Sequence, residues 1–375
     1  MDIRSVIGRV DEAFTKALRA EELPYESIYR ECAGKLTLEE LFSFTAVYNS
    51  ALRCAAGFRR RSDTQNFLKA CSLNSYRLKE EVLAGKFRPK YYRQKRIMER
   101  GKVRTIVPPT FSAKVVQKLL CDYLVRPLLE PEMIRTSYAS IVGRGTGRMY
   151  ADVLRALNAN VKNEDTVIVM TDFKGYFDSI DICLLRKMFA ERVADPRVVE
   201  LIMSFSPNAK GLSLGNEISQ IPASFYPTAI DKALKAKLTT HQYFRYMDDI
   251  LFIALNRKEA EEALENERRM AGELGLTLKE PKVVPMREGF SFCKERYRFD
   301  KKKGKYFRLC SKMLFTREKK KLKHFAGEVA KGNMEKEYPP LQYKSVSGAL
   351  KARPNSQKSR ERLEGFYQRC IREGR

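Results

Sequence analysis

Two adjacent aspartates interrupt a run that otherwise has the composition of a β-strand. The run extends from Phe244 to Ile253, and Asp248 and Asp249 lie near its middle. Charges beside an apolar core are costly unless hydrogen bonds or cations satisfy them. Aspartates also serve ordinary tight turns, where they bond to the local backbone. The pair therefore predicts either a capped turn or a divalent-metal site at the tip of a hairpin.

A second strand-like run supplies another carboxylate. Residues 166–171 are mostly apolar or β-branched, and Asp172 follows them directly. Carboxylates at two strand ends can share metal ions, and Mg²⁺ prefers a few carboxylates together with substrate phosphates. Two such ions, about 3.5–4 Å apart, activate an attacking hydroxyl and stabilise a leaving group. Asp172 and Asp248 are therefore the first candidates for metal ligands.

The charge of the chain predicts a polyanionic partner. Lys and Arg number 72 against 46 Asp and Glu, which gives a net charge of +26. The basic residues are clustered: residues 90–104 hold seven basic and one acidic residue, and residues 294–323 hold fourteen and three. Clustering of this kind favours nucleic acid, bound with strong salt dependence, over a merely solvated basic surface.

Other classes of protein fit the composition poorly. No apolar run approaches the ~18 residues of a spanning helix and no signal peptide precedes the first charges, so we expect a cytoplasmic protein without membrane attachment. The eight cysteines form no C-x-x-C motif, and the chain has two histidines. This pattern argues against a zinc site and against Ser-His-Asp or Cys-His hydrolases. The chemistry must come from carboxylates and lysines.

Five motifs, in this order, resemble those of the reverse transcriptase family. They are R-x-I-x-x-P from Arg104, S-Y-A from Ser137, D-x-x-x-x-F from Asp172, G-N-x-x-S-Q from Gly215 and Y-x-D-D from Tyr246. The resemblance is to the bacterial, group II intron-like lineage, and most of all to diversity-generating retroelement enzymes. It implies an α+β right-hand polymerase, with fingers, a palm of antiparallel sheet plus helices, and a helical thumb, preceded by a helical N-terminal region.

The resemblance also divides the chain into regions. It implies a helical region at residues 1–85, fingers at 86–165, a palm with the catalytic aspartates at 166–288, and a primer-grip-like hairpin with a basic thumb and C-terminal region at 289–375. Apolar spacing predicts helices at 36–55, 113–130, 181–192 and 258–274, and a hairpin within 87–109. Because proline removes a backbone donor, Pro222 and Pro227 predict that the helix after the fourth motif begins at Thr228.

The resemblance implies a role for each matching residue. Asp172, Asp248 and Asp249 would be catalytic and, with Phe173, would surround two Mg²⁺ ions, or Mn²⁺ in their place. Lys282 would protonate the departing pyrophosphate, although an exposed loop lysine explains it equally simply. Residues implied in nucleotide binding are Lys102, Arg104, Phe177, Leu214, Gly215 and Gln220, and those implied in template or primer binding are Tyr138, Arg144, Tyr246 and Met247.

Two of these positions keep a second interpretation, and a third, Leu214, departs from the residue that many relatives have. The planar fork of Arg104 suits a triphosphate, but an ordinary cationic hairpin gives the same sequence. Phe177 would stand under the sugar and exclude a 2′-hydroxyl, although a core phenylalanine is an equal explanation. Leu214 stands where many relatives have Gln, as in diversity-generating enzymes, and a lost amide donor suggests relaxed fidelity. Cys293 and Lys294 replace the Leu-Gly of the primer-grip hairpin.

The expected function is RNA-directed DNA polymerisation in a bacterial or phage retroelement of the diversity-generating class, which copies a structured RNA into complementary DNA by two-metal nucleotidyl transfer. The expected partners are an RNA template, a DNA or RNA primer and deoxynucleoside triphosphates, with a small basic accessory protein or a cognate noncoding RNA. A phage-defence reverse transcriptase acting with a noncoding RNA is the alternative. A third interpretation, from a different class, is a basic RNA-binding scaffold that has lost catalysis.

Overall fold

The computed structural model of the chain describes residues 33–99, 102–206, 210–309, 312–351 and 357–373. Its contacts divide the chain into two units, each built from separate stretches of sequence. The first unit contains the described residues up to Gly145, together with Phe173–Leu234 and Glu265–Lys279. The second contains Thr146–Asp172, Lys235–Leu264 and the described residues from Glu280 onward.

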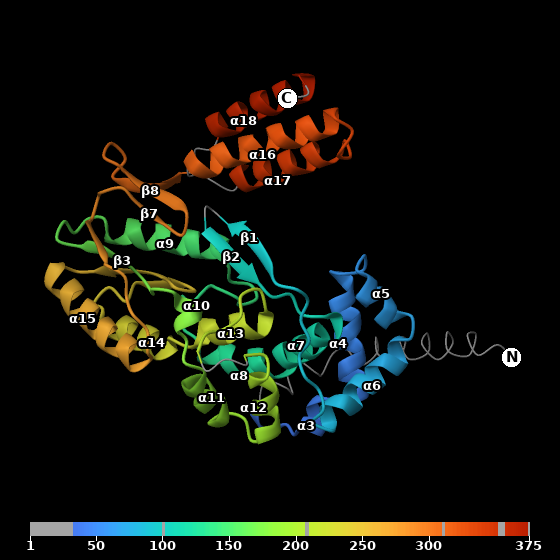
Figure 1. Ribbon diagram of the computed structural model, residues 1–375. Helices are drawn as coiled ribbons and strands as arrows, with labels where there is room; N and C mark the ends of the chain where they lie inside the picture. The colour runs from blue at the N-terminus through green and yellow to red at the C-terminus, as the bar shows by residue number, and fades with distance from the viewer. Residues whose placement is uncertain (1–32, 100–101, 207–209, 310–311, 352–356, 374–375) are drawn as a thin grey trace. The chain divides into compact units, whose positions relative to one another are not determined.

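The first unit is mainly helical (Figure 1). Its first elements are η1 (Ala33–Lys35), α3 (Leu38–Leu41), α4 (Phe44–Ala56), α5 (Ser62–Leu68) and α6 (Cys71–Leu83). The single helix expected over residues 36–55 is wrong, because two caps divide it. Thr37 and Glu40 form a capping box at α3, and the Ser43 side chain accepts a hydrogen bond from the Ala46 amide at the start of α4. Gly57 is the C-cap of α4.

The hairpin expected within residues 87–109 is confirmed. Strands β1 (Lys95–Glu99) and β2 (Lys102–Ile106) pair in antiparallel register. The helix expected over 113–130 is observed as α7 (Phe111–Leu120), the π-helical turn η2 (Cys121–Val125), α8 (Arg126–Leu129) and the 3₁₀ turn η3 (Glu130–Glu132). Pro127 falls in the first turn of α8, where its missing N–H costs little, so it does not end the helix.

Five helices between residues 176 and 237 belong to the first unit, as does part of a later helix that begins in the second unit. They are α10 (Tyr176–Ser179), α11 (Ile182–Ala190), α12 (Pro196–Met203), α13 (Glu217–Phe225) and α14 (Thr228–Lys237), whose last residues belong to the second unit. Helix α11 confirms the prediction for residues 181–192, with Asp181 as its N-cap. The start expected at Thr228 is confirmed for α14, but a helix that contains Pro222 precedes it.

A four-stranded antiparallel sheet forms the centre of the second unit. Its strands are β3 (Val167–Asp172), β4 (Tyr243–Tyr246), β5 (Asp249–Ala254) and β6 (Lys282–Pro285), in the order β4-β5-β3-β6. Burial of the β-branched and aromatic residues of β3, β4 and β5 explains why these runs form strands. Helix α9 (Thr146–Asn160) contacts β4, and α15 (Arg257–Glu273) follows β5, which confirms the helix expected over 258–274.

A second antiparallel sheet follows in the basic segment at residues 290–309. Strands β7 (Phe290–Phe292), β8 (Glu295–Asp300) and β9 (Lys305–Leu309) lie side by side. In β8, alternate residues are buried and exposed from Glu295 to Arg298, which is the period of a strand with one covered face. Asn158 of α9 bonds the outer edge of β9: its side chain donates to the Tyr306 carbonyl and accepts from the Tyr306 amide.

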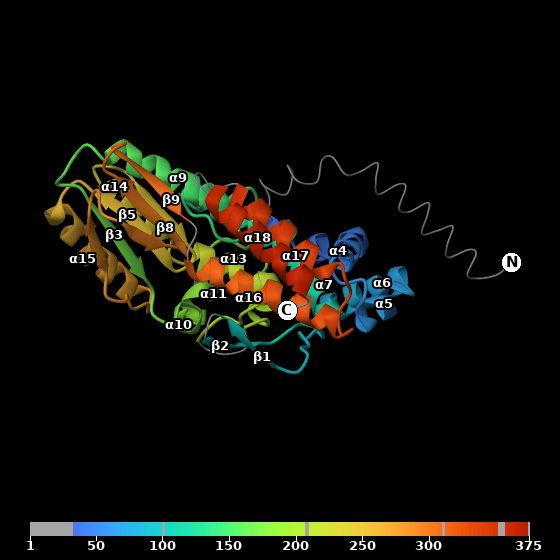
Figure 2. The same ribbon diagram turned by 90° about the horizontal axis from the view of Figure 1, so that it is seen from above.

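Helices α16 (Lys312–Ala330), α17 (Tyr338–Lys351) and α18 (Gln357–Glu373) pack side by side, as both ribbon views show (Figures 1 and 2). Their shared core is formed by Leu322, Leu350 and Leu363. Buried Glu318 accepts a hydrogen bond from the Gln342 side chain at 2.6 Å and so links α16 to α17. Among the described helices, none combines the length and apolarity needed to cross a membrane.

A polar clamp joins α3 to α12 in the first unit. Asp195 caps α12 by accepting from the Arg197 amide, and its other oxygen accepts from the Leu38 amide at 2.9 Å. The side chain of Arg197 bonds Asp195 and also both carboxylate oxygens of Glu39. Hydrogen bonds from the Arg197 side chain, opposed by burial, hold the pKa of Asp195 at about 2. The charged form of Asp195 therefore stabilises the folded state.

We predict that Asp195→Asn lowers the free energy of unfolding at pH 7 by about 1–2 kcal/mol, because charge-assisted bonds are lost. The folded-state pKa lies below the unfolded value, so this stabilisation is present above pH ~4 and is lost as the pH falls towards 2. Urea unfolding at pH 7 and pH 3 should therefore show a gap that narrows at the lower pH. Exposed Asp165→Asn is the control, and a gap equal at both pH values would contradict the prediction.

Candidate active site

Strand register brings Asp172 and Asp249 together in the second unit. Asp172 is the last residue of β3 and pairs directly with Asp249, the first residue of β5. Directly paired residues of antiparallel strands have Cα atoms about 4.5–5.5 Å apart and side chains on the same face. Asp248 precedes Asp249 in the turn between β4 and β5. We call Asp172, Asp248 and Asp249 the carboxylate cluster.

The same face of the sheet carries two further predicted residues. Tyr246 pairs with Asp249 from the other side, so Tyr246, Asp249 and Asp172 form one row across β4, β5 and β3. Lys282, the first residue of β6, pairs with Met170, two residues before Asp172. Because side chains alternate with period two, Lys282 lies on the face of Asp172. It is exposed, as a proton donor to a bound substrate must be, and it begins a strand instead of lying in a loop.

The turn that carries Asp248 is strained. Tyr246 pairs with Asp249, which leaves Met247 and Asp248 as a two-residue hairpin loop. Met247 has a φ of 60°, as the first central residue of a type II′ turn requires, although glycine is favoured there. The fully buried Arg245 donates from Nη1 to the Met247 carbonyl at 3.0 Å. A positive φ is unfavourable for methionine, and this bond helps to stabilise it.

A second hairpin tip touches the carboxylate cluster. Phe292 pairs with Glu295, so Cys293 and Lys294 are the two loop residues between β7 and β8. Their φ values of 43° and 74° are both positive, as in a type I′ turn. The Cys293 thiol donates to Asp249 Oδ2 with an S–O distance of 3.5 Å. Sequence reasoning missed this contact, for which the replacement of Leu-Gly by Cys-Lys was the available signal.

Half-buried Tyr150 and Arg308, together with buried Glu295, hold the tip in place. The hydroxyl of Tyr150, on α9, donates to the Cys293 carbonyl at 2.7 Å. The Arg308 guanidinium lies over the Tyr150 ring, 4.8 Å from its centroid, and its Nε is 4.0 Å from buried Glu295 Oε2. The Cys293 thiol is therefore aimed at Asp249 by contacts from α9, β8 and β9.

The three carboxylates all act on the pKa of the Cys293 thiol. Burial raises the pKa of the Cys293 thiol well above its usual range, and the charges of Asp249, Asp248 and Asp172 raise it further. Burial, followed by the proximity of Cys293, also raises the pKa of Tyr246. The thiol is therefore a neutral hydrogen-bond donor beside concentrated negative charge.

The donor set of the carboxylate cluster fits Mg²⁺. Its carboxylate oxygens are hard ligands, and Asp172 Oδ1 is shielded from solvent. No three ligand side chains close around a common point in the part of the chain that the structure describes. An open set suits Mg²⁺, which usually takes one or two carboxylates and completes its shell with substrate phosphates and water. Phe173 is fully buried and has no side-chain oxygen, so it could contribute only its main-chain carbonyl.

The predicted nucleotide-binding residues that the structure describes lie in the first unit. Phe177 is half-buried on α10, with its ring 5.9 Å from that of Tyr176. Gly215 has a φ of 91°, and a Cβ there would lie 3.1 Å from Ile106 Cγ2, so the chain passes closely over the end of β2. Leu214 is half-buried and Gln220 exposed. The side chains of Lys102 and Arg104 lie outside what the structure describes.

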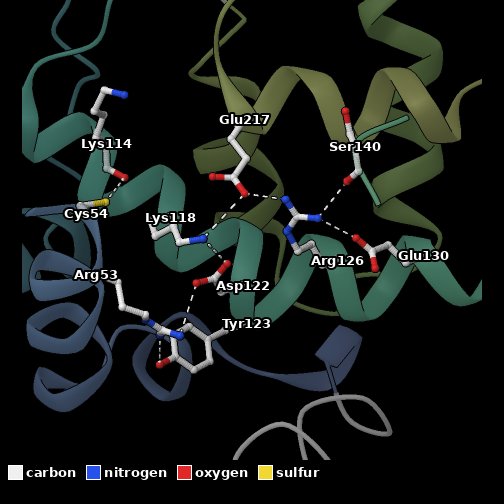
Figure 3. Close-up of polar contacts among 10 residues, drawn as sticks. All are labelled: Arg53, Cys54, Lys114, Lys118, Asp122, Tyr123, Arg126, Glu130, Ser140 and Glu217. Atoms are coloured by element: carbon white, nitrogen blue, oxygen red, sulfur yellow. Dashed lines mark hydrogen bonds and ion pairs between the residues drawn. The ribbon is translucent and has the colours of Figure 1, made fainter. Parts of the chain in front are cut away.

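A polar network fixes the helix that follows Leu214 and Gly215 (Figure 3). Glu217, the first residue of α13, accepts from Arg126 Nη2 at 2.6 Å and lies 3.8 Å from Lys118 Nζ. Arg126 Nη1 also bonds Glu130 and the Ser140 carbonyl. Burial would lower the pKa of Arg126, but its bonds to Glu217 and Glu130 outweigh burial and raise the pKa. The network therefore remains charged and anchors α13.

Two residues expected to contact template or primer, Tyr138 and Arg144, contact other parts of the protein. Tyr138 is fully buried, which leaves its side chain no surface for nucleic acid. Arg144 Nη1 donates to the carbonyls of Ile134 at 2.7 Å and Ser137 at 3.2 Å, and so braces its own loop. The expected contact through Tyr138 is therefore corrected to a core position, and Arg144 has a structural task.

Comparisons with known proteins give one finding. The sequence model of a family described as "Reverse transcriptase (RNA-dependent DNA polymerase)" matches residues 90–311, which is more than half of the chain. A search of curated proteins found no match.

We predict that Cys293→Ala raises the Mg²⁺ concentration needed for half-maximal nucleotide incorporation, roughly five- to tenfold, because Asp249 loses a hydrogen bond of about 1 kcal/mol. Cys293→Ser, which keeps a donor, should stay closer to the unchanged protein. The measurement is primer extension across a Mg²⁺ titration. Equal behaviour of the alanine and unchanged proteins would show that the thiol does not position Asp249.

Proposed function

The chain belongs to the reverse transcriptase (RNA-dependent DNA polymerase) family, and we propose that its RNA-directed DNA synthesis takes place at the carboxylate cluster. The observation that carries this proposal is the register of β3 and β5, which pairs Asp172 with Asp249 beside Asp248. Tyr246 and Lys282 share the face of these carboxylates. A scaffold without catalysis would have no need to hold these charges together.

The proposed reaction is a phosphoryl transfer. The 3′-hydroxyl of the primer loses its proton to solvent, its oxygen forms a bond to the α-phosphorus of a deoxynucleoside triphosphate, and the bond from that phosphorus to the pyrophosphate oxygen breaks. Two Mg²⁺ ions, when bound, lower the pKa of the attacking hydroxyl and neutralise the leaving pyrophosphate. Asp172 and Asp248 would hold these ions, while Asp249, bonded by Cys293, keeps the cluster in register. Lys282 donates the proton that pyrophosphate gains on departure.

Elements of the first unit would select the nucleotide. Phe177 is half-buried, so part of its ring is available to a sugar, and a bulky ring excludes a 2′-hydroxyl by contact. Gly215 lets the backbone approach β2, where the resemblance places Arg104. The Arg126–Glu217 bond fixes the helix that begins directly after this glycine. We propose that this arrangement sets the width of the nucleotide site.

Helices α16–α18 fit the role of a thumb that holds duplex backbone. Lys320, Lys321 and Lys323 of α16 are exposed, and the three helices share an apolar core of their own. Cations on a rigid support contact phosphates without reading sequence. Template choice would then depend on a structured RNA or on a partner such as a small basic protein.

Within the family we propose a diversity-generating enzyme. The supporting residue is Leu214, which is half-buried next to Gly215 and offers no amide to check the nascent base pair. Relaxed copying is the expected consequence. A phage-defence enzyme that copies its own noncoding RNA shares the chemistry and differs in its products.

We predict that Asp248→Ala lowers primer extension at least ~10²-fold, the typical effect of removing a group that stabilises transition-state charge. Affinity for RNA should stay within about twofold, because phosphate contacts made by basic side chains carry that affinity. Extension assays and RNA-binding titrations test this together. The control is Asp165→Ala, an exposed aspartate before β3. Retained synthesis in Asp248→Ala would remove the carboxylate cluster from the mechanism.

We predict that Leu214→Gln narrows the spectrum of misincorporation, because an amide donor is restored beside the base pair. Deep sequencing of complementary DNA made from one template by both proteins measures this directly. Substitutions concentrated at template adenines in the unchanged protein would favour diversification. Faithful products from one small RNA, unaffected by the substitution, would favour the defence alternative.

A further inference from the structure

The β7–β9 sheet has one covered and one open face. Phe290, Tyr297 and Tyr306 point to the covered face, where the Phe290 and Tyr297 rings stack with centroids 5.0 Å apart. The Tyr306 hydroxyl bonds the Glu288 carbonyl and accepts from the Arg287 amide. Because side chains alternate along a strand, the residues between these aromatics belong to the opposite face.

The open face is basic and aromatic. Arg296 and Arg298 are exposed on β8, and Arg298 pairs across the sheet with Phe307, which is half-buried. These residues line a groove of about 800 Å³, together with Arg287, Lys301 and Lys302 at its ends. The groove follows the length of β8, so an extended chain is the shape that fits it best.

The charge of the groove lacks compensation. Arg296 and Arg298 form no ion pair with any residue that the structure describes. Asp300, the one acid of the lining, accepts from the amides of Lys302 and Lys303 and so closes the turn after β8. Arg287 is the exception, since it pairs with Glu164. A polyanion would therefore find four uncommitted cations, two on β8 and two in the turn that follows it.

We infer that this open face binds a single-stranded stretch of RNA, with phosphates on Arg296 and Arg298 and a base stacked on Phe307. Aromatic side chains beside cations on an exposed sheet suit unpaired bases, which present their faces for stacking. In a duplex the faces of the bases are stacked on one another, so a duplex would contact only the cations of the open face. This inference rests on the proposed function in one respect: the RNA is taken to be the template or its cognate RNA.

The site is separate from the reacting atoms. Cys293, at one end of the β7–β8 hairpin, bonds Asp249, whereas Lys301 and Lys302 follow the other end of β8. A strand of six residues spans about 20 Å. The groove would therefore hold RNA that is not being copied at that moment, and so retain one template on the enzyme.

The test compares three proteins: Arg296→Glu/Arg298→Glu, Phe307→Ala, and the control Arg257→Glu/Lys258→Glu. The control makes the same charge change on exposed positions of α15. Binding of a fluorescent 12-nucleotide unstructured RNA is measured by anisotropy at several salt concentrations. Extension of a preformed primer–template duplex, too short to leave an overhang beyond the active site, is measured in parallel.

We expect the double arginine variant to bind the RNA at least about tenfold more weakly, with a salt slope reduced by roughly 1.4 for two lost phosphate contacts. Phe307→Ala should weaken binding roughly five- to tenfold without changing the salt slope, since one base stack is lost. Short-duplex extension should remain intact in both, which also shows that they fold.

Other outcomes would overturn the inference. If the control variant weakens RNA binding as much as the arginine variant does, the loss of affinity reflects the change in net charge, and the groove is not an RNA-binding site. If Phe307→Ala binds normally, no base stacks there and the face is not a single-strand platform. Failure of the unchanged protein to extend any duplex would refute the proposed function but not the RNA site, because RNA binding is measured independently.

Discussion

The structure depends on the pairing of two acidic strand ends. Asp172 and Asp249 occupy directly opposed positions of β3 and β5, and Asp248 adds a third negative charge in the adjoining turn. Like charges directly opposed across a sheet destabilise it. The apolar remainder of β3 and β5 must therefore stabilise the pairing, and its residues are buried on both faces of the sheet, as Ile168 and Val169 show on β3. Burial of these apolar residues therefore offsets the destabilisation that the opposed carboxylates cause.

Two strained hairpin tips also help to position the carboxylate cluster. Met247 and Cys293 both have positive φ, where side chains other than glycine are unfavourable. Each is held by a bond to its carbonyl, from Arg245 for Met247 and from Tyr150 for Cys293. Strain in both tips is therefore supported from outside the turn. The side chains of Arg245 and Tyr150 therefore help to set the orientation of the carboxylates.

Local sequence predicted much of this arrangement and missed its long-range part. The strand ends at Asp172 and at the Asp248 turn follow from composition and period, as do helices α11 and α15. The contact between Cys293 and Asp249 joins residues 44 positions apart, which no local pattern encodes. Strands β8 and β9 carry little apolar signal because residues 294–309 are rich in charge, although Glu295, Arg296, Tyr297 and Arg298 alternate as the residues of a strand do. Tyr138 resembled a surface contact, although an aromatic ring in an apolar setting is as readily a core residue.

Asn158 has a consequence for how copies of the protein behave. Its side-chain amide presents one donor and one acceptor to the Tyr306 backbone, so it imitates a neighbouring strand at one residue of β9. An exposed strand edge is a template on which another chain can pair. Because Tyr306, the second residue of β9, is already bonded, β9 offers no continuous ladder to a strand of a second molecule. A single side-chain amide therefore protects this edge of the β7–β9 sheet from pairing with another chain.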